Sequence, residues 1–193
     1  MKKIGVVLSG CGVYDGSEIH ESVLTILAIN KLGAQPVFLS LNKDQTHVIN
    51  HQQGEPEKGE TRNMMTEAAR IARGPVQDLR DVNSDELDAV VFPGGFGAAK
   101  NFSCFVFEGK DMTVDPNIET FIKNCHSAKK PLGFICISPV LAAKIIPDVK
   151  VTIGSDQGTA EAITSFGAEH QISTVTDAVV DETNLVVSTP AYM

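Results

Sequence analysis

The segment GFICISPV, residues 133–140, holds a cysteine in surroundings that could make it reactive. Cys136 lies between a short apolar run, typical of a buried strand, and Ser138-Pro139, typical of a helix start in which Ser138 is a candidate cap. Such a sharp turn lifts a side chain above the sheet edge, and a helix N-terminus favours thiolate, so the pattern predicts a lowered pKa for Cys136. Free cysteines are also common packing residues, and the local pattern leaves both interpretations open.

A glycine turn, Pro93-Gly94-Gly95, follows a second apolar run at 89–92. Without Cβ atoms, the backbone N–H groups of Gly94 and Gly95 can approach a developing negative charge, as an oxyanion hole requires. The alternative is a tight strand-to-helix connection with no ligand. The glycine spacing matches neither a dinucleotide-binding loop nor a phosphate-binding loop.

Two acidic residues, Glu18 and Glu21, are three positions apart and therefore share one face of a predicted helix. One of them could enter a strand-end crevice as a general acid–base while the other stays in solvent. The alternative is an ordinary acidic first turn that complements the helix dipole. His47 and His51 are the one histidine pair with helical ligand spacing, and we expect them in a solvated segment. No cysteine spacing indicates zinc, so we expect no metal and no cofactor.

The bulk composition narrows the classes of function. The 193 residues carry a net charge of -8, 42% are hydrophobic and 21% are charged, which is close to the average of globular proteins. No run of basic residues is longer than a pair, so we expect no nucleic-acid partner. The apolar stretch at 4–8 is too short for a secretion signal or a membrane span. We therefore expect a cytoplasmic protein with reduced thiols and no membrane partner.

Strand-like and helix-like segments alternate along the chain. Strands are expected at 3–8, 36–40, 46–50, 89–92, 130–136, 151–154, 178–181 and 184–189, and helices at 17–32, 61–73, 115–129, 138–146 and 158–167. Within the first helix, Ser17 is the expected cap and Gly33 the expected end.

This alternation predicts an α/β fold, a flavodoxin-like three-layer sandwich with a mostly parallel central sheet, in one domain over residues 1–193. The sequence ends in STPAYM (188–193) and so stops directly after the last expected strand. We therefore expect a further helix or a partner to cover that face of the sheet.

Several segments together resemble one protein family. They are KKIGVVLSGCGVYDGSEIHE (2–21), VINH (48–51), ETRNMMTEAARIARG (60–74), PGGFGAAKN (93–101), KPLGFICISP (130–139), TIGSD (152–156) and TPAYM (189–193). The chain resembles the class I glutamine amidotransferase-like superfamily, in its PfpI-like branch. It is most similar to the enhancing-lycopene-biosynthesis or sigma cross-reacting proteins, which are also called glyoxalase-like.

The resemblance implies roles for particular residues. Cys136 matches the nucleophile of the elbow, and Glu21 matches the acid that approaches the thiol. Gly95, beside Gly94, and the N–H of Ile137 match the oxyanion-hole donors. Where many superfamily members have a histidine about twenty residues after the elbow, this chain has Asp156 at the end of TIGSD. Since a Cys-His pair activates the thiol in amide chemistry, this departure argues against amidotransferase or peptidase activity.

The resemblance further implies a glyoxalase that needs neither glutathione nor metal, acts on a small 2-oxoaldehyde, and forms a homodimer. Apparent deglycase activity and an indirect link to isoprenoid synthesis also follow from it. The alternative from another class is a redox-sensing regulatory or chaperone-like protein, in which Cys136 is oxidised and Glu21 stabilises the product.

Overall fold

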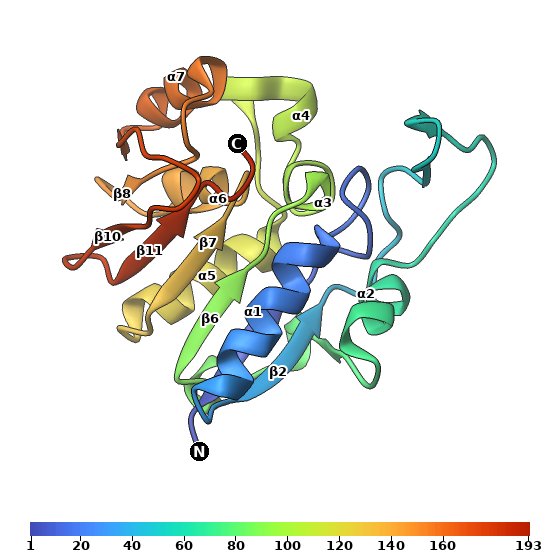
Figure 1. The fold of residues 1–193 in the computed structure, drawn as a ribbon, viewed down its shortest axis with the longest axis horizontal. Coiled ribbons are helices and arrows are strands. Elements are labelled where there is room, and N and C mark those ends of the chain that lie inside the picture. Colours follow the sequence, from blue (N-terminus) through green and yellow to red (C-terminus); the bar gives the residue numbers. More distant parts are fainter.

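A seven-stranded sheet forms the middle layer of the computed structural model, which describes residues 1–193 (Figure 1). The strand order is β10-β11-β7-β6-β1-β2-β5, and every neighbouring pair is parallel except β10 and β11. The strands of this sheet are β1 (Lys3–Val7), β2 (Gln35–Ser40), β5 (Gln77–Asp78), β6 (Ala89–Phe92), β7 (Leu132–Ile135), β10 (Val179–Asp181) and β11 (Val186–Thr189). The predicted α/β fold with a mostly parallel sheet is confirmed.

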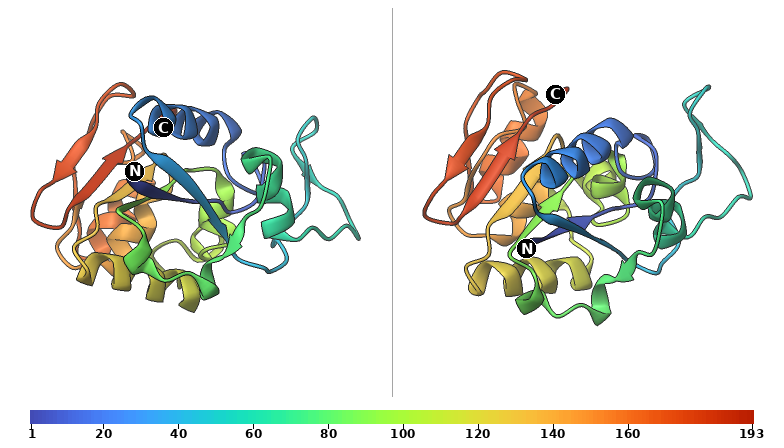
Figure 2. Two further views of the ribbon diagram at one scale, coloured as in Figure 1. Left: turned by 90° about the horizontal axis from the view of Figure 1, so that it is seen from below. Right: turned by 60° about the horizontal axis from the view of Figure 1, so that its bottom comes forward.

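Helices lie on both faces of this sheet, with α1 on one side and α5 on the other (Figure 2). The α-helices are α1 (Ile19–Lys31), α2 (Met64–Ala72), α3 (Phe96–Lys100), α4 (Phe105–Glu108), α5 (Pro116–Ser127), α6 (Pro139–Ile145) and α7 (Gln157–Ser165). Three single 3₁₀ turns are η1 (Leu79–Asp81), η2 (Ser84–Glu86) and η3 (Gly109–Asp111). None of the helices combines the length and the apolar composition that crossing a membrane would require.

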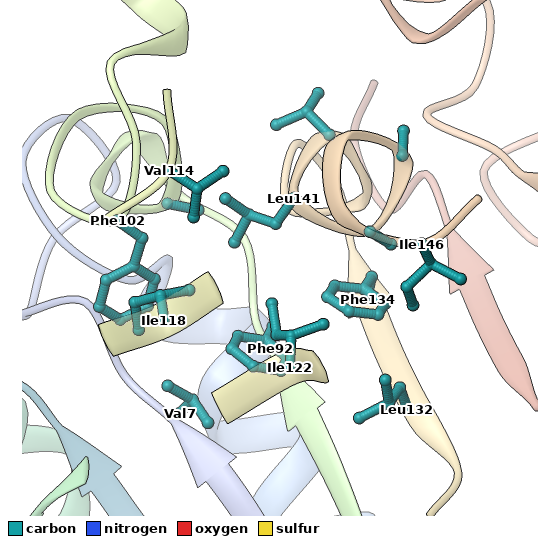
Figure 3. Close-up of a cluster of buried hydrophobic side chains, with 14 of the residues drawn as sticks. Val7, Phe92, Phe102, Val114, Ile118, Ile122, Leu132, Phe134, Leu141 and Ile146 are labelled. Carbon is teal, nitrogen blue, oxygen red and sulfur yellow. The ribbon is translucent and has the colours of Figure 1, made fainter. Parts of the chain in front are cut away.

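The main core fills the space between the sheet and helices α5 and α6 (Figure 3). Phe92 of β6 and Phe134 of β7 stack there with ring centroids 5.0 Å apart. Ile118 and Ile122 of α5 and Leu141 of α6 are fully buried in the same cluster. This packing supports the parallel pairing of β6 with β7, so the turns that follow the two strands lie next to each other.

The predicted strand at 151–154 is wrong in both extent and place. Only β8 (Lys150–Val151) is a strand, and it pairs with β9 (Glu169–His170) in a separate two-stranded sheet. The N–H of Thr152 donates to the side-chain oxygen of Ser188 and not to a strand backbone. A buried apolar run resembles a strand in sequence even when side chains satisfy its backbone.

The predicted strand at 46–50 is likewise reduced to β3 (Ile49–Asn50), which pairs with β4 (Glu55–Pro56). The two strands form a hairpin over residues 49–56, and this exposed segment projects from the body of the molecule (Figure 1).

One half of a sheet face has no helix over it. Val91, Gly133 and Val187 are aligned with Val6, which packs under α1 and α2, so these residues lie on the α1 side of the sheet. An apolar groove of about 340 Å³ runs over β6, β7 and β11 there. The groove leaves Val187 40% exposed, and the expectation that a helix or a partner covers this face stays a prediction.

Candidate functional site

The carboxyl ends of β1, β6 and β7 meet at one edge of the sheet because the three strands are neighbouring and parallel. The chain leaves β1 towards α1 on one face, whereas the segments after β6 and β7 lead to α5 and α6 on the other. Ligands of open α/β sheets bind at such a reversal of direction. The segments that follow these strands carry Glu21 in the first turn of α1, Gly94-Gly95 after β6 and Cys136 after β7. The fold therefore brings these predicted residues together.

Cys136 forms the elbow between β7 and α6 in a left-handed backbone conformation, with φ of 61°. A residue with a Cβ costs roughly 1–2 kcal/mol in this conformation, so the surrounding contacts must hold it there. Its N–H donates to the carbonyl of Thr189 on β11 at 2.9 Å. The elbow predicted from the sequence is therefore present.

Ser138 stabilises this elbow in a way that the sequence did not indicate. The expected N-cap hydrogen bond is absent. Instead, the fully buried Oγ accepts from the Ile135 N–H at 2.8 Å and donates to the Phe92 carbonyl at 2.7 Å. The elbow is thereby tied to the end of β6, where the glycine turn begins.

Glu21 reaches the elbow from the first turn of α1. Its Oε2 accepts a 2.7 Å hydrogen bond from the Gly94 N–H, and its carboxyl group lies close enough to the Cys136 side chain for each group to shift the pKa of the other. The residue is only 6% exposed, and its Oε1 has no hydrogen-bond partner. Glu21 therefore offers a buried, unpaired carboxyl oxygen beside the thiol.

The pKa of Cys136 is raised to about 12. Burial is the largest cause, and the negative charge and hydrogen bonding of Glu21 also raise it. The N–H groups of Ile137 and Gly95 act in the opposite direction by hydrogen bonding. The lowered thiol pKa predicted from the sequence is wrong, since desolvation by the packed elbow outweighs the helix N-terminus. Cys136 is consequently a thiol at neutral pH.

Burial also raises the pKa of Glu21, whereas hydrogen bonds from the Gly94 N–H and the Cys136 side chain lower it. A carboxylate with a raised pKa is a stronger base than an exposed one, so Glu21 is suited to accept the thiol proton.

The glycine turn fits the space between these two groups. A Cβ on Gly94 would lie 2.5 Å from the Cys136 Cβ and 2.7 Å from the Glu21 Oε2. Gly95 has φ of 92°, and a Cβ there would collide with the backbone of Gly16 and Glu18. The N–H groups of Gly95 and Ile137 lie near enough to the Cys136 sulfur to lower the thiol pKa, so they are the candidate donors to an oxygen on a carbon bound to that sulfur.

The start of α1 differs from the expectation. Glu18 is the N-cap, while Ser17 accepts a hydrogen bond from the Ser9 N–H instead. Neither Glu18 nor Glu21 remains in solvent, as both are buried. His20 is 75% exposed in its side chain and pairs with Glu18 at 2.8 Å, so it does not reach Cys136. The sequence feature that could have identified Glu18 as the N-cap is its three-residue spacing from Glu21, which resembles a capping box.

Asp156 is not brought to this site. Its exposed carboxylate caps α7 by accepting from the Thr159 N–H at 2.8 Å, and the hydrogen bonds from Thr159 lower the pKa of Asp156. It lines a separate cavity of about 400 Å³ together with residues of α7 and η3. Cys11 also lies elsewhere, packed beside the small cluster under α1 and α2.

The chain has close relatives among known proteins. No protein-family model matches it. The "Glutamine amidotransferase-like class 1 domain-containing protein 3, mitochondrial" of Homo sapiens is 48% identical over 200 residues, which cover 99% of this chain and 75% of that protein. The "ES1 protein, mitochondrial" of Danio rerio is 36% identical over 206 residues, covering 98% and 76%.

Solved structures show the same relationship. An isoprenoid biosynthesis protein with amidotransferase-like domain from Ehrlichia chaffeensis has a TM-score of 0.90 at 37% identity, covering 98% of this chain and 88% of that one. A DJ-1 superfamily protein from Agrobacterium tumefaciens has a TM-score of 0.60 at 16% identity, covering 99% and 83%, and this likeness concerns the fold alone.

Proposed function

The chain belongs to the family of ES1 proteins and glutamine amidotransferase-like class 1 domain-containing proteins, and on that premise we propose that it is a glutathione-independent glyoxalase. Its substrate is glyoxal, with methylglyoxal as a second 2-oxoaldehyde, and its product is glycolate or lactate. The observation that carries this proposal is the buried, unpaired Oε1 of Glu21 beside the Cys136 thiol.

The first step is attack of sulfur on the aldehyde. Glu21 accepts the proton of the Cys136 thiol while the sulfur bonds to the aldehyde carbon. The resulting alkoxide oxygen of the hemithioacetal accepts hydrogen bonds from the N–H groups of Gly95 and Ile137. Proton transfer during the attack explains how a thiol with a pKa of about 12 can react at neutral pH.

The second step moves a proton between the two substrate carbons. Glu21 first gives the thiol proton to the alkoxide oxygen and is a carboxylate again. It then removes the proton from the carbon bonded to sulfur, which gives an enediolate, and returns that proton to the neighbouring carbon, while the hydroxyl proton passes from the first oxygen to the second. The first carbon is thereby oxidised to a thioester and the second is reduced to an alcohol, so no external oxidant is needed. Water then cleaves the thioester, releasing the 2-hydroxy acid and restoring the thiol.

A histidine is not required in this sequence of steps because no amine leaves. The histidine nearest to Glu21 in the chain, His20, faces solvent, and Asp156 caps a helix, so neither is assigned a role in proton transfer.

The test is a rate assay with glyoxal and methylglyoxal. Wild type should form glycolate and lactate well above the rate of free thiols, and Cys136→Ala and Glu21→Gln should each lower kcat/KM by at least about a hundredfold. Cys104→Ala removes a different half-buried thiol and should leave the rate unchanged. Full turnover by Cys136→Ala would contradict the proposal.

The second candidate is the redox-sensing or chaperone-like role, for which the contact between Glu21 and the Cys136 sulfur is the specific observation. It predicts stoichiometric oxidation of Cys136 with a change in partner binding, and no turnover. The raised pKa of Cys136 weighs against it, since oxidation proceeds through thiolate. Apparent deglycase activity and an indirect role in isoprenoid synthesis stay predictions.

Partners and compartment are also part of the proposal. We expect a small 2-oxoaldehyde and a second copy of the chain as partners, and neither nucleic acid nor membrane. The relatives from Homo sapiens and Danio rerio are named as mitochondrial, whereas a cytoplasmic location for this chain stays a prediction.

A further inference from the structure

Four of the hydrogen bonds that Glu18 makes connect the start of α1 with the candidate site and with the surface. Its Oε2 accepts from the N–H of Glu21 at 2.7 Å, and its own N–H donates to the carbonyl of Gly94 at 2.9 Å. Its carbonyl accepts from the Ser22 side chain at 2.7 Å. Glu18 thus holds the helical turn that carries Glu21 against the glycine turn that carries the anion-binding N–H groups.

The fourth hydrogen bond leads to the surface. The second carboxyl oxygen of Glu18, Oε1, lies 2.8 Å from the Nδ1 of His20. The Glu18 side chain is 11% exposed, whereas that of His20 is 75% exposed. His20 therefore faces the solvent, while the carboxylate that it contacts is buried next to Glu21.

The titratable groups that act on Glu21 come from two elements. Cys136 approaches from the elbow after β7, and Glu18 approaches from the cap of α1 itself. The glycine turn after β6 contributes only the Gly94 N–H. The negative charge of Glu18 is one of the causes that raise the pKa of Glu21.

We propose that Glu18 is a positioning residue that holds Glu21 in place and transmits the charge of His20 to it. This inference rests on the proposed glyoxalase function and deepens it, because it assigns a control of the acid–base group. A protonated His20 neutralises part of the charge of Glu18, so Glu21 then feels a weaker negative neighbour.

The geometry gives two opposite expectations. Glu18→Gln keeps an oxygen that can cap α1 but removes the charge, so the Glu21 carboxyl should titrate at lower pH. His20→Ala leaves the charge of Glu18 without its partner, so the Glu21 carboxyl should titrate at higher pH. Once Glu18→Gln has removed the charge, the further removal of His20 should have no effect. The Glu21 carboxyl of the double variant should therefore titrate as it does in Glu18→Gln alone.

Carbon-13 NMR of the Glu21 side-chain carboxyl carbon measures these titrations without any substrate. The acidic limb of the kcat/KM profile for glyoxal should move in the same directions, since Glu21 must be ionised to accept the thiol proton. Added salt should shrink the His20→Ala shift, because His20 is exposed. Glu119→Gln, an exposed charge change on α5, is the matched control and should shift nothing.

Shifts in the same direction for Glu18→Gln and His20→Ala, or no shift in either, would overturn this inference whatever the turnover. If Glu18→Gln does not fold, a lack of shift in His20→Ala, whose side chain is exposed, still overturns it. Opposite NMR shifts in a protein that does not turn over glyoxal would instead reject the proposed function and retain the coupling of Glu18 to Glu21.

Discussion

Cys136 and Glu21 are two acids in one buried space, and burial raises the pKa of both. The thiolate and the carboxylate cannot easily coexist there, so the pair behaves as one unit that exchanges a proton. This arrangement keeps the sulfur protonated, and it makes the carboxyl group a stronger base than an exposed one. The cost of the arrangement is a charge held in an apolar surrounding.

That cost leads to a prediction about stability. Because the folded pKa of Glu21 is raised above its ordinary value of 4.5, the folded state binds the proton more tightly, and stability falls as pH rises through the folded pKa. Glu21→Gln removes the charge and keeps an oxygen for the Gly94 N–H. The variant should therefore unfold at a higher temperature than wild type at neutral pH and at a similar temperature near about pH 4.

Thermal unfolding followed by circular dichroism across this pH range measures the effect, with about 2–4 °C expected for each kcal/mol relieved. Glu119→Gln serves as the control for a charge change at an exposed position. A lower unfolding temperature of Glu21→Gln at neutral pH would show that the carboxylate stabilises the fold.

At the scale of elements, the candidate site is formed by the first turn of α1, the glycine turn after β6 and the elbow after β7. Each of them packs closely against another. The strand ends are aligned by the parallel register of β1, β6 and β7, and the first turn of α1 is held against the glycine turn. The close approach that involves both reacting groups surrounds Gly94, where any Cβ meets both Cys136 and Glu21.

Gly94→Ala should therefore separate the thiol from the carboxyl group. We expect a fall in kcat/KM on the order of a hundredfold, since a shift of about 1 Å in a reacting group has that effect. Gly74→Ala is the matched control, because a Cβ there meets no atom closer than 4.0 Å. Equal activity of the two variants would mean that the glycine turn can relax without disturbing the site.

The N-terminus of α7, which Asp156 caps, gives a second prediction at this scale. Asp156→Ala removes the cap of α7 and should cost about 1 kcal/mol of stability while leaving glyoxal turnover intact. Asp156→Asn, which can still cap, should restore most of that stability. Urea unfolding and the rate assay measure both quantities, and a large loss of kcat in either variant would return Asp156 to the site.

For the whole molecule, the notable feature is the uncovered half of the sheet on the α1 side. Val180 and Val187 are 56% and 40% exposed on β10 and β11, beside the apolar groove over β6, β7 and β11. Side chains of this kind normally pack under a third layer in an α/β sandwich. The interpretation that a helix or a partner covers this face is a prediction that the groove supports.

The expected homodimer is tested at the same scale. Light scattering over a range of concentrations should give a mass twice that of the 20.6 kDa chain. A single chain mass at every concentration would contradict the prediction. Native mass spectrometry adds an independent check and would also reveal any additional segment or bound partner.

The sequence by itself determined the order of the elements, the parallel sheet and the position of the elbow at Cys136. Apolar runs of strand length and capped helical segments are local signals, and Gly33 acts as the sequence predicts, at the end of α1. The elbow around Cys136 was also local, because a strand, a turn and a proline-led helix are contiguous in the chain.

Only the tertiary structure decided the chemistry of the site. Whether the Cys136 pKa rises or falls depends on burial by distant segments, and whether Glu18 or Glu21 faces the thiol depends on where α1 meets the glycine turn. The role of Asp156 as a helix cap depends on the position at which α7 begins. Desolvation and close approach arise between residues far apart in the chain, so local patterns of residue type do not contain them.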